Sequence, residues 1–255
     1  MELEFRNWLF VFARAGGFFA VLPPFASSNL PRQLRVGLGA LMAFVIAPVI
    51  AGPSVLPSTL TGWIGMLAVE VIVGLTLGFL ARMVFYAADF AGRLIANEMG
   101  LSMARTMNPM LGEQTDAPGL ILFYFTMVMM LTLDLHHWLI AGFHRTCELL
   151  PPGGVAANPA LLDHMVNHTR NIFVIGTQMA APVIASAFII MLLFSVLGRL
   201  VPQMNSFVES FGVRVLAGLA VFGLSIEIMA QHLLNYLRRL PEDMMLVATY
   251  LAGGG

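Results

Sequence analysis

The stretch "NIFVIGTQMAAPVIASAFIIMLLFSVL", residues 171–197, decides the fold class. It contains no charged side chain, and an apolar run longer than about 18 residues with few charges is typical of a helix that crosses a bilayer. Of all 255 residues, 58% are hydrophobic and 11% are charged, whereas soluble domains carry about 25% charged residues. We therefore predict a protein of the integral-membrane type.

Five further apolar segments surround this one, separated by stretches rich in proline, glycine and polar residues. They cover residues 7–22, 36–51, 63–81, 120–141 and 213–231. No strand-like alternation of apolar and polar residues competes with these runs. The prediction is an all-α fold of integral-membrane-type helical hairpins with six main apolar segments.

Ionisable residues interrupt several of these segments, namely Arg14, Glu70, Asp134 and Glu227. Such groups are costly in hydrocarbon unless they face protein or water. One interpretation is a proton path through a transporter. The other is an ion pair or hydrogen bond at a helix–helix contact, with Arg14 or Arg82 as the partner of an acid, in helices that pack mainly on other subunits.

Composition excludes several classes of function. All 13 basic residues are arginine, so neither a P-loop nor Schiff-base chemistry has the lysine that it requires. The net charge of −1 indicates no nucleic-acid partner. The chain holds one cysteine, and we find no catalytic triad. We predict no enzymatic activity, no cofactor and no metal. His136 and His137 follow Asp134, and the pairs His144–Cys147 and His164–His168 have ligand-like spacing, but no third ligand is evident.

Small residues recur at helical spacing in the middle of the chain. A residue every fourth position places them on one face, along which another helix backbone can approach closely. We expect these helix-packing residues to face another helix, within this chain or in a partner. They are Gly74, Gly78, Ala88, Gly92, Ala96, Gly100 and Ala104. Beside them, Asp89 and Arg93 have the spacing of an ion pair.

A methionine stripe continues from this face into a polar segment. Met99, Met103 and Met107 are four residues apart, and methionine suits surfaces that close around variable shapes, although such a stripe is more often core. Asn108-Pro109 is expected to end the helix. The following "LGEQTDAPG", residues 111–119, adds a second break. We predict a flexible loop on a closely packed stem.

The most strongly interrupted stretch of the C-terminal half is "LGRLVPQMNSF", residues 197–207. Pro202 is expected to end a helix that begins near residue 171 and is kinked at Pro182. Ser206 followed by Glu209 has the pattern of a capping box for the next helix. The prediction is a helix, a tight turn and a second helix.

Three motifs together resemble the flagellar biosynthetic protein FliR family, called SctT in injectisomes. "LGRLVPQMNSF" resembles its proline-glutamine-x-asparagine signature, "NEMGLSMARTMNP" (97–109) its central glycine-leucine stretch, and "LDLHHWLI" (133–140) its His-His element. The resemblance extends over nearly the whole chain. The sequence departs from the family at Leu135, where glycine is common, and after Phe207, where "VESFGV" replaces glycine-phenylalanine-proline.

The resemblance implies the R subunit of a type III secretion export gate, in the flagellar basal body at the bacterial inner membrane. The expected partners are FliP, FliQ and FlhB, and unfolded flagellar proteins would pass through the channel. Residues 1–255 would form a single export-gate domain. Approximately residues 1–165 would be FliP-like, with a plug loop at 106–119, and residues 166–255 would be a FliQ-like hairpin.

We expect two further groups of functional residues on this basis. The gating or plug residues are Met103, Met107, Asn108, Pro109, Met110, Leu111, Gly112, Pro118 and Gly119. The residues that shape the C-terminal hairpin are Arg199, Pro202, Gln203, Asn205, Phe207 and Arg214. The alternative function is a proton-coupled secondary transporter that uses its intramembrane acids.

Overall fold

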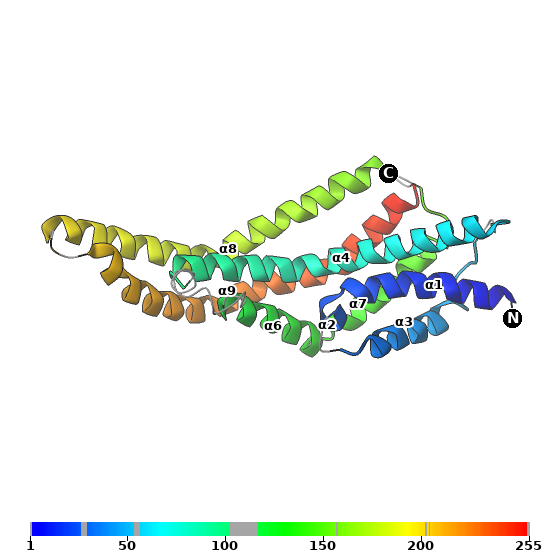
Figure 1. The fold of residues 1–255 in the computed structure, drawn as a ribbon, viewed down its shortest axis with the longest axis horizontal. Coiled ribbons are helices and arrows are strands. Elements are labelled where there is room, and N and C mark those ends of the chain that lie inside the picture. The colour runs from blue at the N-terminus through cyan, green and yellow to red at the C-terminus, as the bar shows by residue number, and fades with distance from the viewer. Residues whose placement is uncertain are drawn as a thin grey trace. The chain divides into compact units, whose positions relative to one another are not determined.

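The computed structural model describes residues 2–26, 30–53, 57–101, 117–156, 158–201, 203 and 205–253. Within these ranges every regular element is a helix, which confirms the all-α prediction. The helices, shown in Figure 1, are α1 (Glu2–Val21), α2 (Pro23–Ala26), α3 (Arg32–Ile46), α4 (Leu60–Glu98), α6 (Ala117–Thr132), α7 (Leu135–Leu149), α8 (Pro159–Leu200) and α9 (Ser206–Leu251).

Each of the six apolar segments overlaps a helix, but fewer than six helices of the described part of the chain are candidates for crossing a membrane. Among the described residues, α4, α8 and α9 are long and apolar enough, and α6 with α7 makes a fourth candidate if the bent pair is one span. The 15 residues of α3 extend only about 22 Å at 1.5 Å per residue, less than the roughly 30 Å of a hydrocarbon core.

The segment predicted at 120–141 is broken rather than continuous. Helices α6 and α7 meet at an angle of 74°, and Asp134 between them adopts a left-handed backbone with φ of 55°. A left-handed residue cannot continue a right-handed helix, and aspartate tolerates this conformation better than most residues. The turn directly before His136 and His137 is therefore formed by Asp134.

Several helix ends differ from the sequence prediction. Helix α4 ends at Glu98, ten residues before Asn108, so Gly100 lies beyond the helix, and Ala104 lies outside the described residues. Helix α8 begins at Pro159 instead of near residue 171, and it continues through Pro182.

The start of α9 also differs, because the cap is Asn205 and not Ser206. The Val208 N–H donates to Asn205 Oδ1 at 3.4 Å, which is the bond that an N-cap side chain makes. Ser206 is the first residue of the helix.

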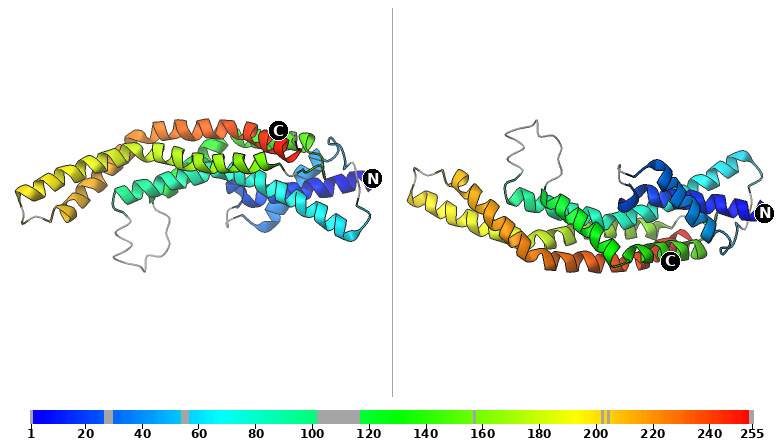
Figure 2. Two further views of the ribbon diagram at one scale, coloured as in Figure 1. Left: turned by 90° about the horizontal axis from the view of Figure 1, so that it is seen from above. Right: turned by 90° about the horizontal axis from the view of Figure 1, so that it is seen from below.

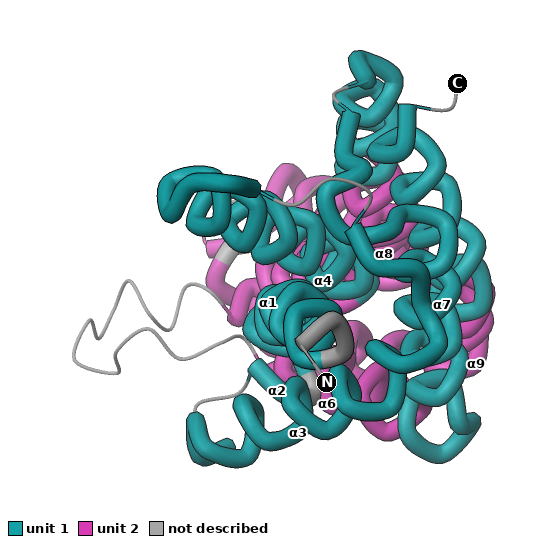
Figure 3. Tube along the Cα trace, turned by 90° about the vertical axis from the view of Figure 1, so that its right-hand side faces the viewer, with its two compact units in different colours: residues 1–84, 130–169, 237–255 teal, residues 85–129, 170–236 magenta. Residues whose placement is uncertain are grey.

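The chain divides into two compact units, which Figure 3 distinguishes by colour. Unit 1 contains residues 1–84, 130–169 and 237–255. Its core is aromatic and aliphatic, with Phe10, Phe18 and Phe143 fully buried, and the rings of Phe18 and Phe143 are 5.1 Å apart. Helices α1 and α3 lie side by side in this unit (Figure 1).

Unit 2 contains residues 85–129 and 170–236. It holds the second half of α4, most of α6, the C-terminal part of α8 from residue 170 and the N-terminal part of α9 up to residue 236. The latter two lie side by side as a helical hairpin (Figure 2). Phe85 packs against Phe123 of α6, and Phe90 packs against Phe173 of α8, so both α6 and α8 contact α4.

Candidate functional site

The last turn of α4 is closed by a glycine. Gly100 has a φ of +80°, its N–H donates to the carbonyl of Asn97, and the Leu101 N–H donates to the carbonyl of Ala96, both at 2.9 Å. This pair of bonds is a Schellman motif, which satisfies the last carbonyl groups of a helix and favours glycine at the left-handed position. The chain therefore leaves α4 in a defined direction, just before residues 102–116.

The other end of that segment is anchored on the same helix. Gly92 of α4 faces the first turn of α6, where a Cβ atom at Gly92 would overlap the backbone of Gly119 and lie 2.8 Å from the carbonyl carbon of Pro118. Only a residue without a side chain allows two backbones to come this close. Segment 102–116 thus follows the end of α4 and precedes the start of α6. We call these two helix ends its stems, and they are held together inside unit 2.

Helix α9 supports the first of these stems. The side chain of Met99 is fully buried, and its Cγ lies 2.6 Å from the position that a Cβ of Gly218 would occupy. The ring of Phe211 lies 2.9 Å from the corresponding position at Gly100. Arg214 is buried beside them. The structure therefore brings Met99, Gly100 and Arg214 together, although they were predicted as parts of three different features.

Most of the predicted plug lies outside the described residues. This applies to Met103, Met107, Asn108, Pro109, Met110, Leu111 and Gly112. Pro118 and Gly119 are buried in the first turn of α6, where proline is well tolerated because its missing N–H would have had no partner in the helix. The last three residues of the predicted loop at 106–119 are therefore helical, because α6 begins at Ala117.

The residues predicted to shape the hairpin have different environments. Arg199, Gln203 and Asn205 are exposed, and Asn205 caps α9. Pro202 and the side chain of Phe207 lie outside the described residues.

The small-residue ridge packs within the chain at the positions that the structure describes. A Cβ atom at Gly74 would overlap the carbonyl oxygen of Arg14, and one at Gly78 would lie 2.6 Å from the carbonyl oxygen of Phe18, both on α1. Ala88 and Ala96 are buried. Beside the ridge, Arg93 and Asp89 form the predicted ion pair at 2.8 Å.

A buried ion pair joins α1 to α4 in unit 1. Both Nε and Nη2 of Arg14 lie 2.7 Å from Oε2 of Glu70. Nη1 of Arg14 donates to the carbonyl oxygen of Leu150 at 2.9 Å, and the N–H of Gly153 donates to Oε1 of Glu70 at 3.1 Å. The exposed fractions are 1% for Arg14 and 0% for Glu70. For Glu70 the sequence left two interpretations open, a proton path and an ion pair with Arg14 or Arg82. The structure has the ion pair with Arg14.

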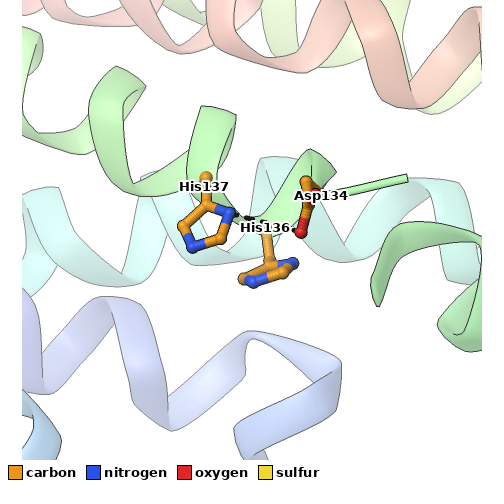
Figure 4. A group of neighbouring side chains, drawn as sticks. All are labelled: Asp134, His136 and His137. Atoms are coloured by element: carbon orange, nitrogen blue, oxygen red, sulfur yellow. Dashed lines mark ion pairs between the residues drawn. The ribbon is translucent and has the colours of Figure 1, made fainter. Parts of the chain in front are cut away.

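The other two acids of the apolar segments have different surroundings. Asp134 and Glu227 are exposed. In Figure 4, Asp134 and His137 lie at the start of α7 and form an ion pair at 3.5 Å, with the ring of His136 beside them. Asp134, His136 and His137 are one of two groups among the described residues that could hold a metal ion. Solvent reaches Asp134 and His137, which can therefore be satisfied by water.

Comparison with known proteins identifies the family. Residues 5–240 match the family model for bacterial export proteins, family 1. The chain belongs to this family. Two relatives named flagellar biosynthetic protein FliR are similar to it. The protein of Caulobacter vibrioides is 30% identical over 220 residues (85% of this chain and 86% of the relative), and that of Bacillus subtilis is 31% identical over 216 residues (83% and 82%).

A relative from a secretion system is also similar. Yop proteins translocation protein T of Yersinia pestis is 26% identical over 199 residues, which cover 77% of this chain and 76% of the relative. The predicted resemblance to the FliR and SctT family is confirmed. Membership makes the chain a membrane component of a bacterial type III export apparatus, which is a transport subunit rather than an enzyme.

Proposed function

We propose that this chain is the R-type subunit of the flagellar type III export gate in the bacterial inner membrane. It would form a channel with FliP and FliQ and contact FlhB, and unfolded flagellar proteins would pass through. The observation that carries the proposal is the family match, which extends over residues 5–240 and so includes both units. The similarity to flagellar relatives favours the flagellar form over an injectisome.

The burial of the long helices supports assembly with partners. In the most apolar window of α8 only 17% of the residues are buried, and in that of α9 only 28%. Such exposed apolar surface requires lipid or protein to cover it. A FliP-like part of approximately residues 1–165 and a FliQ-like hairpin at 166–255 would place this surface against neighbouring subunits.

The two stems of segment 102–116 support a gating role for that segment. Both ends are fixed, one by the Schellman motif at Gly100 and the other by the contact between Gly92 and Gly119. A segment with fixed ends can vary in its middle without disturbing the helices. We propose that it closes the channel as a plug and that its methionines fit around the passing chain.

Co-expression with partners tests the assembly. We expect a tagged form of this chain to co-purify with FliP-type and FliQ-type subunits as one complex of defined mass, measured by native mass spectrometry. A chain that purifies alone as a stable, monodisperse species and captures neither subunit would contradict the proposal. That outcome would favour the proton-coupled transporter.

A further inference from the structure

Two histidines and an aspartate meet where α8 begins and α9 ends. His164 and His168 are one turn apart on α8, and Asp243 lies in the last part of α9. All three belong to unit 1. Nothing in the function proposed above uses them, and the inference drawn from them stands independently of it.

Their geometry is that of a convergent ligand set. The rings of His164 and His168 have centroids 4.4 Å apart, and Nε2 of His168 lies 3.4 Å from Oδ1 of Asp243. Each of the three side chains offers one ligand atom, and these atoms lie within 4.8 Å of one another. Ligands of a tetrahedral zinc ion are about 3.4 Å apart for bonds of about 2.0–2.1 Å, so small side-chain rotations suffice.

The cluster also contains buried nitrogen atoms that have no hydrogen-bond partner among the described residues. These are Nε2 of His164 and Nδ1 of His168. His168 is only 7% exposed. A buried polar atom without a partner costs about 1–3 kcal/mol, and most native structures avoid this cost. A bound cation satisfies the lone pair of Nε2 of His164, which has no hydrogen-bond partner among the described residues.

The surroundings hold the ligands in place from both helices. The N–H of Ala156, just before α8, donates to the carbonyl oxygen of Leu251 at 2.7 Å. The ring of Tyr250 lies 5.5 Å from that of His164. These contacts tie the start of α8 to the end of α9, so the histidines and the aspartate are positioned before any ion binds.

The donor set selects the kind of ion. Two imidazole nitrogens with one carboxylate oxygen suit zinc and similar divalent transition metals and do not suit magnesium or calcium, which prefer oxygen ligands. With three protein ligands a fourth position stays open for water. Asp134, His136 and His137 offer the same donor types, but two of those three residues are exposed.

We propose that His164, His168 and Asp243 bind one zinc-type divalent ion, which links the beginning of α8 to the end of α9. The ion would give Nε2 of His164 the partner that it lacks among the described residues, and it would add a cross-link between two segments that are far apart in sequence. Its role is structural, so it stabilises unit 1.

Titration with Co²⁺ tests the site, because a four-coordinate Co²⁺ ion absorbs visible light. We expect the full chain, purified with its co-expressed partners and treated with a chelator, to bind one Co²⁺ per chain and to lose it on addition of Zn²⁺. The variant His164→Gln should bind at least tenfold more weakly, since even outer-shell changes alter metal affinity by about 10–100-fold. It should also lose the increase in melting temperature that Zn²⁺ gives the unaltered protein.

Two control variants assign the ion to its site. His144→Gln changes a histidine outside the cluster, and His136→Gln changes the other candidate group; both should bind Co²⁺ with unaltered affinity. His168 and Asp243 form an ion pair with each other, whereas His164 forms none among the described residues, so His164→Gln is expected to fold and decides the test even if Asp243→Asn does not fold. The proposal is wrong if the unaltered protein binds no Co²⁺, if His164→Gln binds it equally well, or if His136→Gln abolishes binding.

Discussion

At the scale of single residues, the ion pair of Arg14 and Glu70 lies buried in the core of unit 1. Two charges that are almost completely buried would be costly to desolvate. Here the guanidinium group contacts Glu70 and the carbonyl oxygen of Leu150, and the carboxylate accepts the N–H of Gly153. The pair therefore joins α1 and α4 to the chain that follows α7, and Glu70 is held by this pairing.

Removing one partner of this pair should be costly. Glu70→Ala leaves the guanidinium group of Arg14 buried without its counter-charge, for which we expect a loss of about 3–5 kcal/mol in the free energy of unfolding. The melting temperature of the purified complex in detergent measures this loss.

The double variant Arg14→Met, Glu70→Leu is the matched control. It removes both charges and keeps apolar volume in the core, so its melting temperature should lie well above that of Glu70→Ala. If the double variant is the less stable of the two, the pair contributes more than mutual neutralisation and this interpretation is wrong.

At the scale of helices, α4 organises both units through glycines. Gly74 brings its backbone against Arg14 of α1, and Gly92 brings it against Gly119 of α6. The two contacts lie at different places along one helix of 39 residues. Helix α4 therefore positions both α1 and the start of α6, which is the C-terminal stem of segment 102–116.

A single methyl group tests these contacts. Gly92→Ala places a Cβ atom into the backbone of α6, and we expect a loss of about 1–3 kcal/mol from overpacking. Gly65→Ala on the same helix is the control, since a Cβ there meets nothing within 4 Å and alanine is favoured over glycine in a helix by about 0.5–1 kcal/mol. Thermal unfolding of the two variants compares them. Equal melting temperatures would show that α4 and α6 do not approach closely at Gly92.

Apolar patterning was sufficient to predict where the helices lie but not where each one ends. Helix α4 ends at Glu98 because Gly100 adopts a left-handed backbone, although Asn108-Pro109 was the stronger stop signal in the sequence. Similarly, Asn205 caps α9 in place of Ser206. Gly100 also meets the ring of Phe211, a tertiary contact that a local pattern does not contain, whereas the Asn205 cap is a local bond and asparagine is a favoured N-cap residue.

Contacts between side chains that are distant in sequence were the hardest feature to predict. Glu70 had Arg14 and Arg82 as alternative partners, and only the packing of α1 on α4 selects Arg14. Likewise, His164 and His168 were recognised as a pair with ligand spacing. Their third neighbour, Asp243, lies on another helix, so spacing along the chain could not identify it.

At the scale of the whole molecule, the long apolar helices leave most residues of their most apolar windows unburied. The most apolar windows of α4, α8 and α9 are 39%, 17% and 28% buried, and the helix α3 is too short to cross a bilayer by itself. Both features are expected of a subunit whose helices are covered partly by other subunits. Together with the family match, they support the proposed place of the chain in an export channel.

The conductance of the assembled complex tests the central claim most directly. A variant without residues 110–116 retains both stems, so we expect it to form the same complex with its FliP-type and FliQ-type partners. Reconstituted in planar bilayers, this complex should conduct small ions steadily, while the unaltered complex and the Gly65→Ala control stay closed. If the shortened complex assembles normally and its conductance equals that of the unaltered complex, segment 102–116 does not close the channel.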